Sequence, residues 1–239
     1  MIFRQLFERE SCTYTYLLAC PETRAAALID PVITEVPKYL QLLHELDLTL
    51  VYALDTHTHA DHITGAGELR EQTGCKTLLG EQAQSPCVSE VLSHGDKIQV
   101  GSLTLTALYT PGHTSDSYSF WLEENCEHYL FSGDTLLIRG TGRTDFQNGN
   151  ARDQYRSLFE ILLKLPSQTK VYPAHDYKGW MVSSIAEEQA HNPRLQVTSI
   201  EDYEELMNNL KLPHPTLMDI AVPANRSCGK TDATIPKGK

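Results

Sequence analysis

The sequence predicts an α/β protein whose metal-binding side chains gather at the ends of strands. Apolar runs of strand length alternate with stretches of helical periodicity along the chain. At four places a predicted strand runs almost directly into a histidine or an aspartate. Ligands of α/β proteins bind at strand ends, where loops meet on a rigid scaffold. The pattern therefore predicts both the fold class and the place of the site.

The expected elements follow from local periodicity and turn signals. In the first half we expect a hairpin of strands over 13–19 and 25–30, a helix over 35–46, a strand over 48–54, a helix over 63–72 that stops at Gly74, and a strand over 76–79. In the second half we expect strands over 103–109, 117–122 and 128–131, a helix over 152–164 and a strand over 170–172. One domain over residues 1–228 and a disordered tail over 229–239 complete the prediction.

The composition narrows the functional classes. The chain has 239 residues and a formal net charge of −11, which argues against binding to a nucleic-acid backbone. No apolar run reaches the roughly 18 residues of a membrane span, and the first residues do not resemble a targeting segment. We therefore expect a cytoplasmic protein that binds neither nucleic acid nor membrane. The six scattered cysteines are expected to be reduced thiols.

The densest group of donor side chains follows the apolar run 50–54. His57, His59, Asp61 and His62 form the pattern His-x-His-x-Asp-His. A strand that ends in such a cluster delivers its donors to one point at the rim of a sheet. Neutral imidazole and carboxylate suit zinc, iron and similar divalent metals. We interpret the stretch as part of a metal site rather than as a polar loop that is rich in histidine by chance.

Three further strands end in a donor. They lead to His113 in Thr-Pro-Gly-His, to Asp134 in Ser-Gly-Asp and to His175 in Pro-Ala-His. Each motif alone is a commonplace turn, but four such strand ends in one chain indicate a shared metal site. The other five histidines are expected to have structural or solvent-exposed roles: His44, His94, His128, His191 and His214.

These donors, in this order, resemble those of the metallo-β-lactamase superfamily over about residues 1–180. The resemblance implies a four-layer αββα sandwich with the metal at one edge of its two sheets. Most members of the superfamily are hydrolases that hold two zinc ions. The superfamily alone would therefore suggest a hydrolase.

A narrower resemblance changes that expectation. The stretches 137–147, 172–177, 192–195 and 221–225 are similar to the persulfide dioxygenases, sulfur dioxygenases of the ethylmalonic-encephalopathy-protein type. This resemblance implies one Fe(II) per chain, held by His57, His113 and Asp134. It implies that the neighbouring polar residues orient these ligands and bound water: His59, Asp61, His62 and His175. Thr141 departs from the pattern, since some relatives have a cysteine there.

The implied reaction converts glutathione persulfide, O₂ and water into glutathione and sulfite, a step of hydrogen sulfide metabolism. Zinc is redox-inert, whereas a face of two histidines and one carboxylate leaves three positions open on an octahedral iron. We predict that Arg143 binds a glutathione carboxylate through its planar fork. We predict that Tyr177 places its phenol near the open positions. A structural ion pair at Arg143 and a packed aromatic at Tyr177 are the alternatives.

Two other functions compete with this one. A glyoxalase II-type thioester hydrolase would use all seven donors for two metals, with Asp134 as the bridge. It would place His57, His59 and His113 on one ion, and Asp61, His62 and His175 on the other. A metal-holding sensor without catalysis is the second competitor, and it would release no sulfite. The oligomeric state is left open, with a homodimer as one candidate.

Overall fold

The computed structural model describes residues 1–212 and 217–230. Its contacts divide the chain into two compact units. The first comprises residues 1–92 and 99–103 together with the described residues from 217 on, and the second comprises 93–98 and the described residues from 104 to 212. The predicted α/β class is confirmed, since each unit combines a β-sheet with helices. The single domain over 1–228 stays a prediction, and the predicted tail lies outside the described residues from residue 231 on.

The first unit is built on a six-stranded mixed sheet, with the order β1-β2-β3-β4-β5-β6. The first three strands pair antiparallel, and β3 to β6 run parallel. The predicted hairpin of β2 and β3 is confirmed, and Arg24 in its turn adopts a positive φ of 62°. The strands are β1 (Ile2–Glu8), β2 (Thr13–Ala19), β3 (Ala25–Ile29), β4 (Thr49–Leu54), β5 (Lys76–Gly80) and β6 (Glu90–Leu92).

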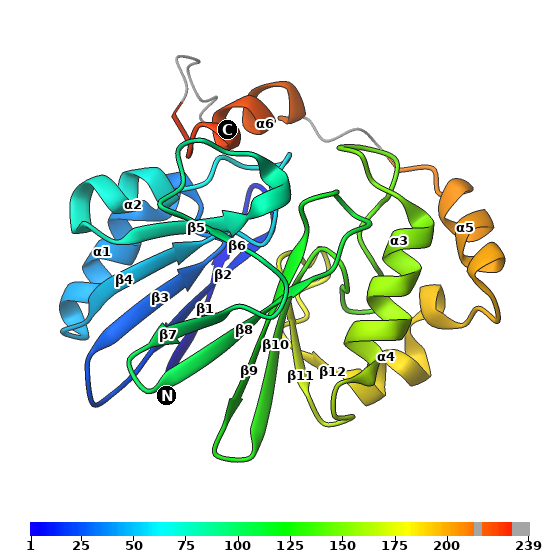
Figure 1. Ribbon diagram of the computed structural model, residues 1–239, viewed down its shortest axis with the longest axis horizontal. Helices are drawn as coiled ribbons and strands as arrows, with labels where there is room; N and C mark the ends of the chain where they lie inside the picture. Colours follow the sequence, from blue (N-terminus) through cyan, green and yellow to red (C-terminus); the bar gives the residue numbers. More distant parts are fainter. Residues whose placement is uncertain (213–216, 231–239) are drawn as a thin grey trace. The chain divides into compact units, whose positions relative to one another are not determined.

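Two helices pack on this sheet, as Figure 1 shows: α1 (Val36–Glu45) and α2 (Ala66–Thr73). Tyr39 and Leu43 of α1 and Leu69 of α2 are buried against apolar side chains of β2, β3 and β4. Gly74 ends α2 as predicted, with a left-handed φ of 77° and its N–H donating to the carbonyl of Arg70. Because α1 and α2 follow strands β3 and β4, the loops that carry polar side chains emerge at the carboxyl ends of those parallel strands.

Another six-stranded sheet, most of whose residues belong to the second unit, has the order β12-β11-β10-β9-β8-β7. β8, β9 and β10 pair antiparallel, whereas β10 and β11 run parallel. Asn125 and Cys126 both adopt positive φ, as a tight two-residue hairpin turn requires. The strands are β7 (Lys97–Val100), β8 (Leu103–Tyr109), β9 (Tyr118–Glu124), β10 (Glu127–Gly133), β11 (Lys170–Pro173) and β12 (Ser183–Ser184).

Helices α3 (Ala151–Arg156), α4 (Ile185–His191) and α5 (Ile200–Asn208) pack with the second sheet around one apolar core. The predicted helix over 152–164 is α-helical only at its start. It continues as a wide π-helical segment over Ser157–Ile161 and ends in a 3₁₀ turn over Leu162–Lys164. The change begins at Ser157, whose hydroxyl donates to the carbonyl of Pro111 at 2.6 Å.

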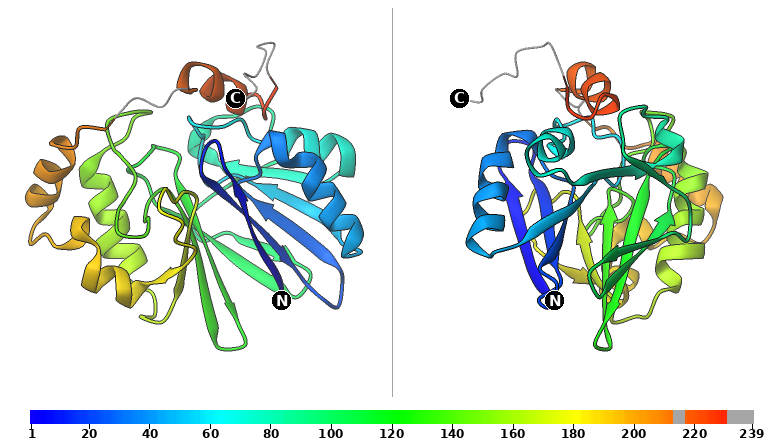
Figure 2. Two further views of the ribbon diagram at one scale, coloured as in Figure 1. Left: turned by 180° about the vertical axis from the view of Figure 1, so that it is seen from behind. Right: turned by 60° about the vertical axis from the view of Figure 1, so that its left-hand side comes forward.

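Several elements were not predicted: β1, β6, β7, β12, α4, α5 and the last helix, α6 (Met218–Arg226). β1 shows no clean alternation, because most of its residues are half-buried, and β12 has only two residues. α6 lies beyond the carboxyl end of β4, beside the loop that follows this strand (Figures 1 and 2). Gly229 and Lys230 still belong to the turn that ends this helix.

The cysteine prediction is wrong for one pair. Cys87 and Cys228 form a disulfide across 141 residues of sequence, within the first unit. The other four cysteines are reduced, as predicted: Cys12, Cys20, Cys75 and Cys126. Spacing could not identify the pair, because a single disulfide between distant residues depends on tertiary structure alone.

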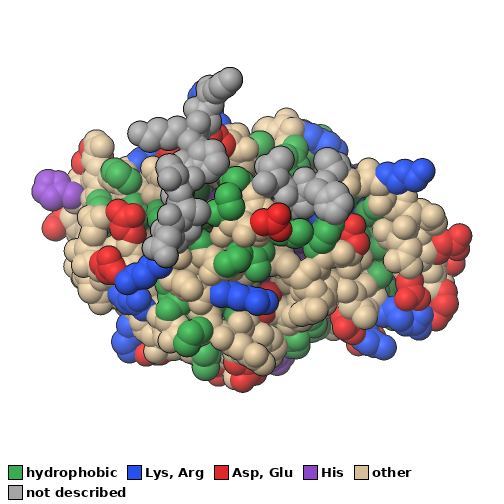
Figure 3. All heavy atoms as spheres, turned by 90° about the horizontal axis from the view of Figure 1, so that it is seen from above, with side chains coloured by type: hydrophobic (Ala, Val, Ile, Leu, Met, Phe, Trp, Pro, Cys, Tyr) green, Lys and Arg blue, Asp and Glu red, His purple; other side chains and the backbone are tan. Residues whose placement is uncertain are grey.

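The described surface mixes charges of both signs. On the face drawn in Figure 3, Lys and Arg side chains are scattered among acidic and apolar ones. Among the described residues, none of the helices has the length and apolar character needed to cross a membrane.

Candidate metal centre

The first set of donors lies in the loop that connects β4 to α2. His57, His59 and His62 are buried, and Asp61 is partly exposed. The ring centroids of His57 and His59 are 4.1 Å apart, and those of His59 and His62 are 4.2 Å apart. The cluster predicted from the sequence is therefore real within this unit. Three imidazoles converge at the carboxyl end of a parallel strand.

A buried carboxylate from the end of β3 organises this loop. Asp30 Oδ1 accepts a hydrogen bond from the backbone N–H of Thr56 at 2.7 Å, and Oδ2 accepts one from the Thr56 hydroxyl at 3.0 Å. The same hydroxyl lies 3.0 Å from Nδ1 of His57. Because the only hydroxyl proton of Thr56 goes to Asp30, the Nδ1 of His57 must donate. The Nε2 of His57 then keeps its lone pair, which is the state that a metal ligand needs.

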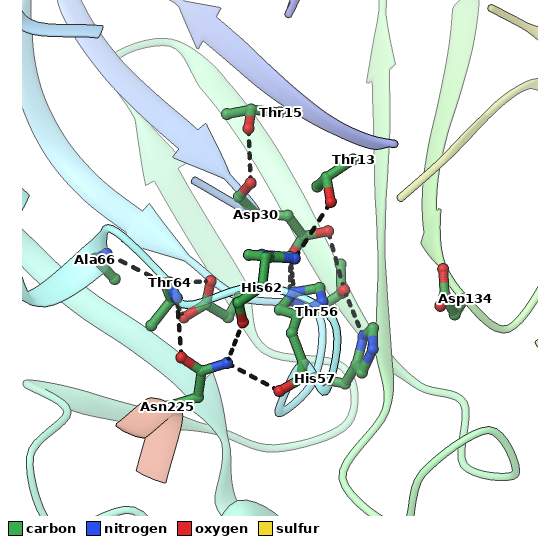
Figure 4. Close-up of polar contacts among 12 residues, drawn as sticks. Thr13, Thr15, Asp30, Thr56, His57, His62, Thr64, Ala66, Asp134 and Asn225 are labelled. Atoms are coloured by element: carbon green, nitrogen blue, oxygen red, sulfur yellow. Dashed lines mark hydrogen bonds and ion pairs between the residues drawn. The ribbon is translucent and has the colours of Figure 1, made fainter. Parts of the chain in front are cut away.

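Asp30 also orients a second histidine. Its Oδ1 lies 3.1 Å from Nε2 of His59, so the carboxylate binds the proton on that nitrogen. The third ring, that of His62, has its Nδ1 within 3.2 Å of the Thr13 hydroxyl and 3.3 Å of Asp61. Each ring is therefore held by a polar group of the protein, and Figure 4 shows the contacts of Asp30, Thr56 and Thr13.

The far end of the loop is closed by Thr64. Its hydroxyl donates to the carboxyl of Asp55, with both oxygens at 2.9 Å, so that the base of the loop is joined across nine residues. The backbone N–H of Thr64 donates to Oδ1 of Asn225 in α6. The amide of Asn225 in turn donates to the carbonyls of His59 and His62 (Figure 4).

Burial affects both carboxyl groups of this network. It raises the pKa of Asp30, and the hydrogen bonds from the backbone and the hydroxyl of Thr56 act in the opposite direction. It raises the pKa of Asp55 well above the usual range, and the nearby Asp30 carboxylate adds to the shift. Two carboxyl groups in one buried site cannot both ionise easily. Of the two, Asp30 is the one that we expect to carry the negative charge, because it accepts more hydrogen bonds than Asp55 does.

The second set of donors lies in the second unit. His113 follows β8, Asp134 follows β10, and His175 follows β11, as predicted. Oδ2 of Asp134 lies 3.5 Å from Nε2 of His113, and its Oδ1 lies 2.7 Å from Nδ1 of His175. The structure therefore brings these three predicted residues together at the ends of three strands of one sheet, of which β10 and β11 are neighbours.

His113 has the same tautomer as His57, for a similar reason. Its Nδ1 donates to the backbone carbonyl of Arg143 at 2.8 Å, since a carbonyl can only accept. The lone pair of His113 is then on Nε2, the atom that faces Asp134. A metal-bound histidine usually donates the N–H of its other ring nitrogen to an acceptor of the protein. The donors therefore fit a divalent metal chemically.

Gly142 allows this approach of the loop to the donors. A Cβ atom at this position would lie 2.3 Å from the carbonyl of Asp134 and 2.7 Å from Nδ1 of His113. The N–H of Gly142 donates to the same Asp134 carbonyl at 2.6 Å. A side chain would therefore push the loop away from both donors.

Arg143 and Tyr177 have different surroundings. The guanidinium of Arg143 forms a two-pronged ion pair with Asp145, at 2.7 and 2.8 Å, and lies over the ring of Phe146. Its fork is therefore paired within its own loop. Tyr177 is 70% exposed, and its ring lies parallel to that of His175 at 6.2 Å between centroids. The alternative of a packed aromatic is wrong for Tyr177.

Three residues of the network were missed by sequence reasoning: Asp30, Asp55 and Asn225. Asp30 and Asp55 each follow a strand, so the rule that identified His113 and Asp134 could have included them. No local pattern marks Asn225, which acts across more than 160 residues of sequence.

The family model described as the metallo-beta-lactamase superfamily matches residues 12–175. The mitochondrial persulfide dioxygenase ETHE1 of Mus musculus is 46% identical over 230 residues, which cover 96% of this chain and 89% of that protein. A probable hydroxyacylglutathione hydrolase of Schizosaccharomyces pombe is 39% identical, but over only 166 residues and 69% of this chain.

Solved structures agree with these similarities. The crystal structure of ETHE1 from Myxococcus xanthus superposes with a TM-score of 0.93 and 53% identity. The match covers 96% of this chain and all of that one. It confirms the predicted fold.

Replacing Asp30 by Asn should weaken metal binding roughly ten- to hundredfold. The new amide would donate to the Thr56 hydroxyl, whose proton would then turn to Nδ1 of His57 and favour the tautomer with a protonated Nε2. The affinity is measured by competition with a chelator. Asp47→Asn, an exposed substitution of the same kind in the first unit, is the control. Equal affinities of the two variants would contradict the assigned role of Asp30.

Proposed function

Because this chain belongs to the metallo-β-lactamase superfamily and, within it, to the persulfide dioxygenases, we propose that it oxidises glutathione persulfide with O₂ and water to glutathione and sulfite. The observation that carries this proposal is 46% identity over 96% of the chain to a persulfide dioxygenase. The similarity to hydroxyacylglutathione hydrolases covers a smaller part of the chain at lower identity. The dioxygenase is therefore favoured over the thioester hydrolase.

We propose that His57, His113 and Asp134 hold one Fe(II) per chain. The tautomers support this assignment, since the hydrogen bonds on Nδ1 leave Nε2 of both histidines with a lone pair. Bound iron would supply the redox chemistry with O₂ that zinc lacks. The family supports a single ion, although the chain also carries the other four donors of a two-metal site.

Those four donors have orienting roles in this proposal. His175 donates from Nδ1 to Asp134 and so fixes the direction of that carboxylate. His59 is held by Asp30, and His62 by Thr13 and Asp61. Groups that are fixed by the protein lose little freedom when substrate binds, which lowers the cost of reaching the reactive arrangement.

Arg143 and Tyr177 are the proposed contacts to substrate. A glutathione carboxylate could replace the carboxylate of Asp145, whose side chain is 56% exposed, without leaving the guanidinium unpaired. The exposed phenol of Tyr177 beside His175 can donate a hydrogen bond to a bound persulfide. The cytoplasmic location and the homodimer stay predictions from the sequence.

The function is tested by measuring oxygen uptake after glutathione persulfide is added to anaerobically iron-loaded protein. Sulfite is assayed in the same vessel, and we expect about one sulfite per O₂ consumed, because both oxygen atoms of O₂ enter the reaction. Zinc-loaded protein is the control, since zinc is redox-inert. Absence of uptake, together with rapid hydrolysis of a glutathione thioester by the zinc form, would overturn the proposal in favour of the hydrolase.

Tyr177→Phe should lower turnover roughly ten- to hundredfold while leaving the iron content unchanged, because only a hydroxyl is removed. Tyr155→Phe is the matched control, since Tyr155 packs against Phe159 and Tyr203 in the helical layer of the second unit. Oxygen uptake at saturating substrate and iron per chain are measured for both variants. If Tyr177→Phe keeps the turnover of the control, the phenol has no part in the reaction.

Arg143→Lys should raise the KM for glutathione persulfide about tenfold, because lysine loses the planar fork that pairs with a carboxylate. The KM for a small persulfide without carboxylates should change little. Asp145→Asn is the control, since it removes the present partner of Arg143 and leaves the guanidinium in place. Equal changes for both persulfides would show that Arg143 acts on the fold of its loop and not on glutathione.

A further inference from the structure

The last helix, α6, contacts the donor loop of the first unit with its side chains and with its backbone. This loop runs from Asp55 to Thr64 and carries His57. α6 comes from the other end of the chain and contains none of the predicted metal ligands. Its contacts are therefore not explained by metal binding itself.

Asn225 is the polar centre of these contacts. Its Nδ2 donates to the carbonyls of His59 and His62, at 2.9 and 2.8 Å, and its Oδ1 accepts from the N–H of Thr64 at 2.9 Å (Figure 4). One side chain thus satisfies three backbone groups of the loop, and it is itself only 5% exposed. A buried amide that matches three backbone partners specifies one conformation of the loop, because any other would leave polar groups unsatisfied.

Apolar and backbone contacts surround this amide. Ile63, between His62 and Thr64, packs against Ala221 and Ala224 of α6. The turn after the helix approaches the chain so closely that a Cβ atom on Gly229 would lie 2.2 Å from the carbonyl of Thr64. The helix and the turn that follows it are therefore tightly packed against this loop.

The Cys87–Cys228 disulfide links the segment after the carboxyl end of α6 to another part of the first unit. Cys228 lies two residues after the end of α6 and is bonded to Cys87, in the segment between β5 and β6. The hydroxyl of Ser85 donates to the carbonyl of Arg226 at 2.9 Å, beside this bond. Cys228 is buried and Cys87 is partly exposed, so a small thiol can approach the bond from the side of Cys87.

We propose that α6 is a redox-controlled clamp on the metal-binding loop. Asn225 is a positioning residue that holds the loop, and the Cys87–Cys228 disulfide keeps the helix in place. Opening the disulfide loosens the hold of Asn225, so that the loop becomes mobile and the metal leaves faster. This inference rests on the proposed function only in that His57 holds a metal, whatever reaction follows.

Glutathione, the thiol product of the proposed reaction, has the chemistry to open the clamp. A glutathione thiolate would attack the sulfur of Cys87, which forms a mixed disulfide and releases the thiolate of Cys228. A second glutathione thiolate would then attack the mixed disulfide, which yields oxidised glutathione and the thiolate of Cys87. Two glutathiones are oxidised and one protein disulfide is reduced. Such a step would link metal retention to the thiol state around the enzyme.

The role of Asn225 is tested with metal-free protein, by amide hydrogen exchange of Thr64. Asn225→Ala should raise this exchange rate roughly tenfold or more, because the acceptor of the N–H is removed. Arg226→Ala, at the exposed neighbouring position of α6, should leave it unchanged. In iron-loaded protein, release of Fe(II) to a chelator should accelerate roughly ten- to hundredfold in Asn225→Ala only. Exchange and release equal to those of the control would overturn the role of Asn225.

The role of the disulfide is tested on the unaltered sequence, which avoids a variant that fails to fold. Reduction with glutathione should accelerate both Thr64 exchange and Fe(II) release, and reoxidation should reverse both. Cys87→Ser should release iron at the fast rate with or without glutathione. Cys126→Ser, at an exposed free thiol, should respond as the unaltered protein does. If Thr64 exchange and Fe(II) release stay unchanged after complete reduction of the disulfide, the proposed redox control is wrong.

A spectroscopic measurement separates positioning from simple loss of stability. The nitric oxide adduct of the Fe(II) form reports the ligand arrangement by electron paramagnetic resonance. Its signal should broaden in Asn225→Ala and in the reduced protein, and it should stay sharp in Arg226→Ala. An unchanged signal, with only a lower unfolding temperature, would overturn the positioning role. None of these readouts depends on sulfite formation, so they stand even if the proposed reaction fails.

Discussion

The donor loop of the first unit depends on one interaction, the pairing of the buried Asp30 carboxylate with the donors around it. A carboxylate removed from water is stable only when hydrogen bonds replace its hydration. Here the backbone N–H and hydroxyl of Thr56 and the ring of His59 supply them. Because the Thr56 hydroxyl donates its proton to Asp30, it can only accept from His57, which places the proton of that ring on Nδ1. The hydrogen bonds that stabilise the buried Asp30 carboxylate thus leave Nε2 of His57 with the lone pair that a metal ligand needs.

The second unit reaches the same result by a different route. The carbonyl of Arg143 accepts from Nδ1 of His113, and His175 donates to Asp134. The carbonyl acceptor is placed by a loop that passes close to His113, which a glycine at position 142 permits. In both units, a fixed acceptor on one nitrogen of a histidine leaves the other nitrogen for the metal. The same chemistry therefore recurs on two unrelated local structures.

The contacts proposed to regulate metal retention join segments that lie far apart in the sequence. The last helix contacts a loop that lies some 160 residues earlier in the sequence. Asn225 makes the polar contacts, and a disulfide holds the end of the helix. Such contacts hold a loop rigid without occupying its donors, so they can change without altering the chemistry of the ligands. A thiol-sensitive bond at this place links metal retention to the thiol that the reaction produces.

The sequence by itself determined the α/β class, the hairpin of β2 and β3, and the positions of the donors His57, His113, Asp134 and His175. These follow from local periodicity and from the rule that loops at strand ends carry function. Only the tertiary structure decided the roles of Asp30 and Asn225, the disulfide and the pairing of Arg143 with Asp145. Hydrogen bonds, ion pairs and disulfides depend on distances between atoms, and residues far apart in sequence leave no periodic signal of such distances.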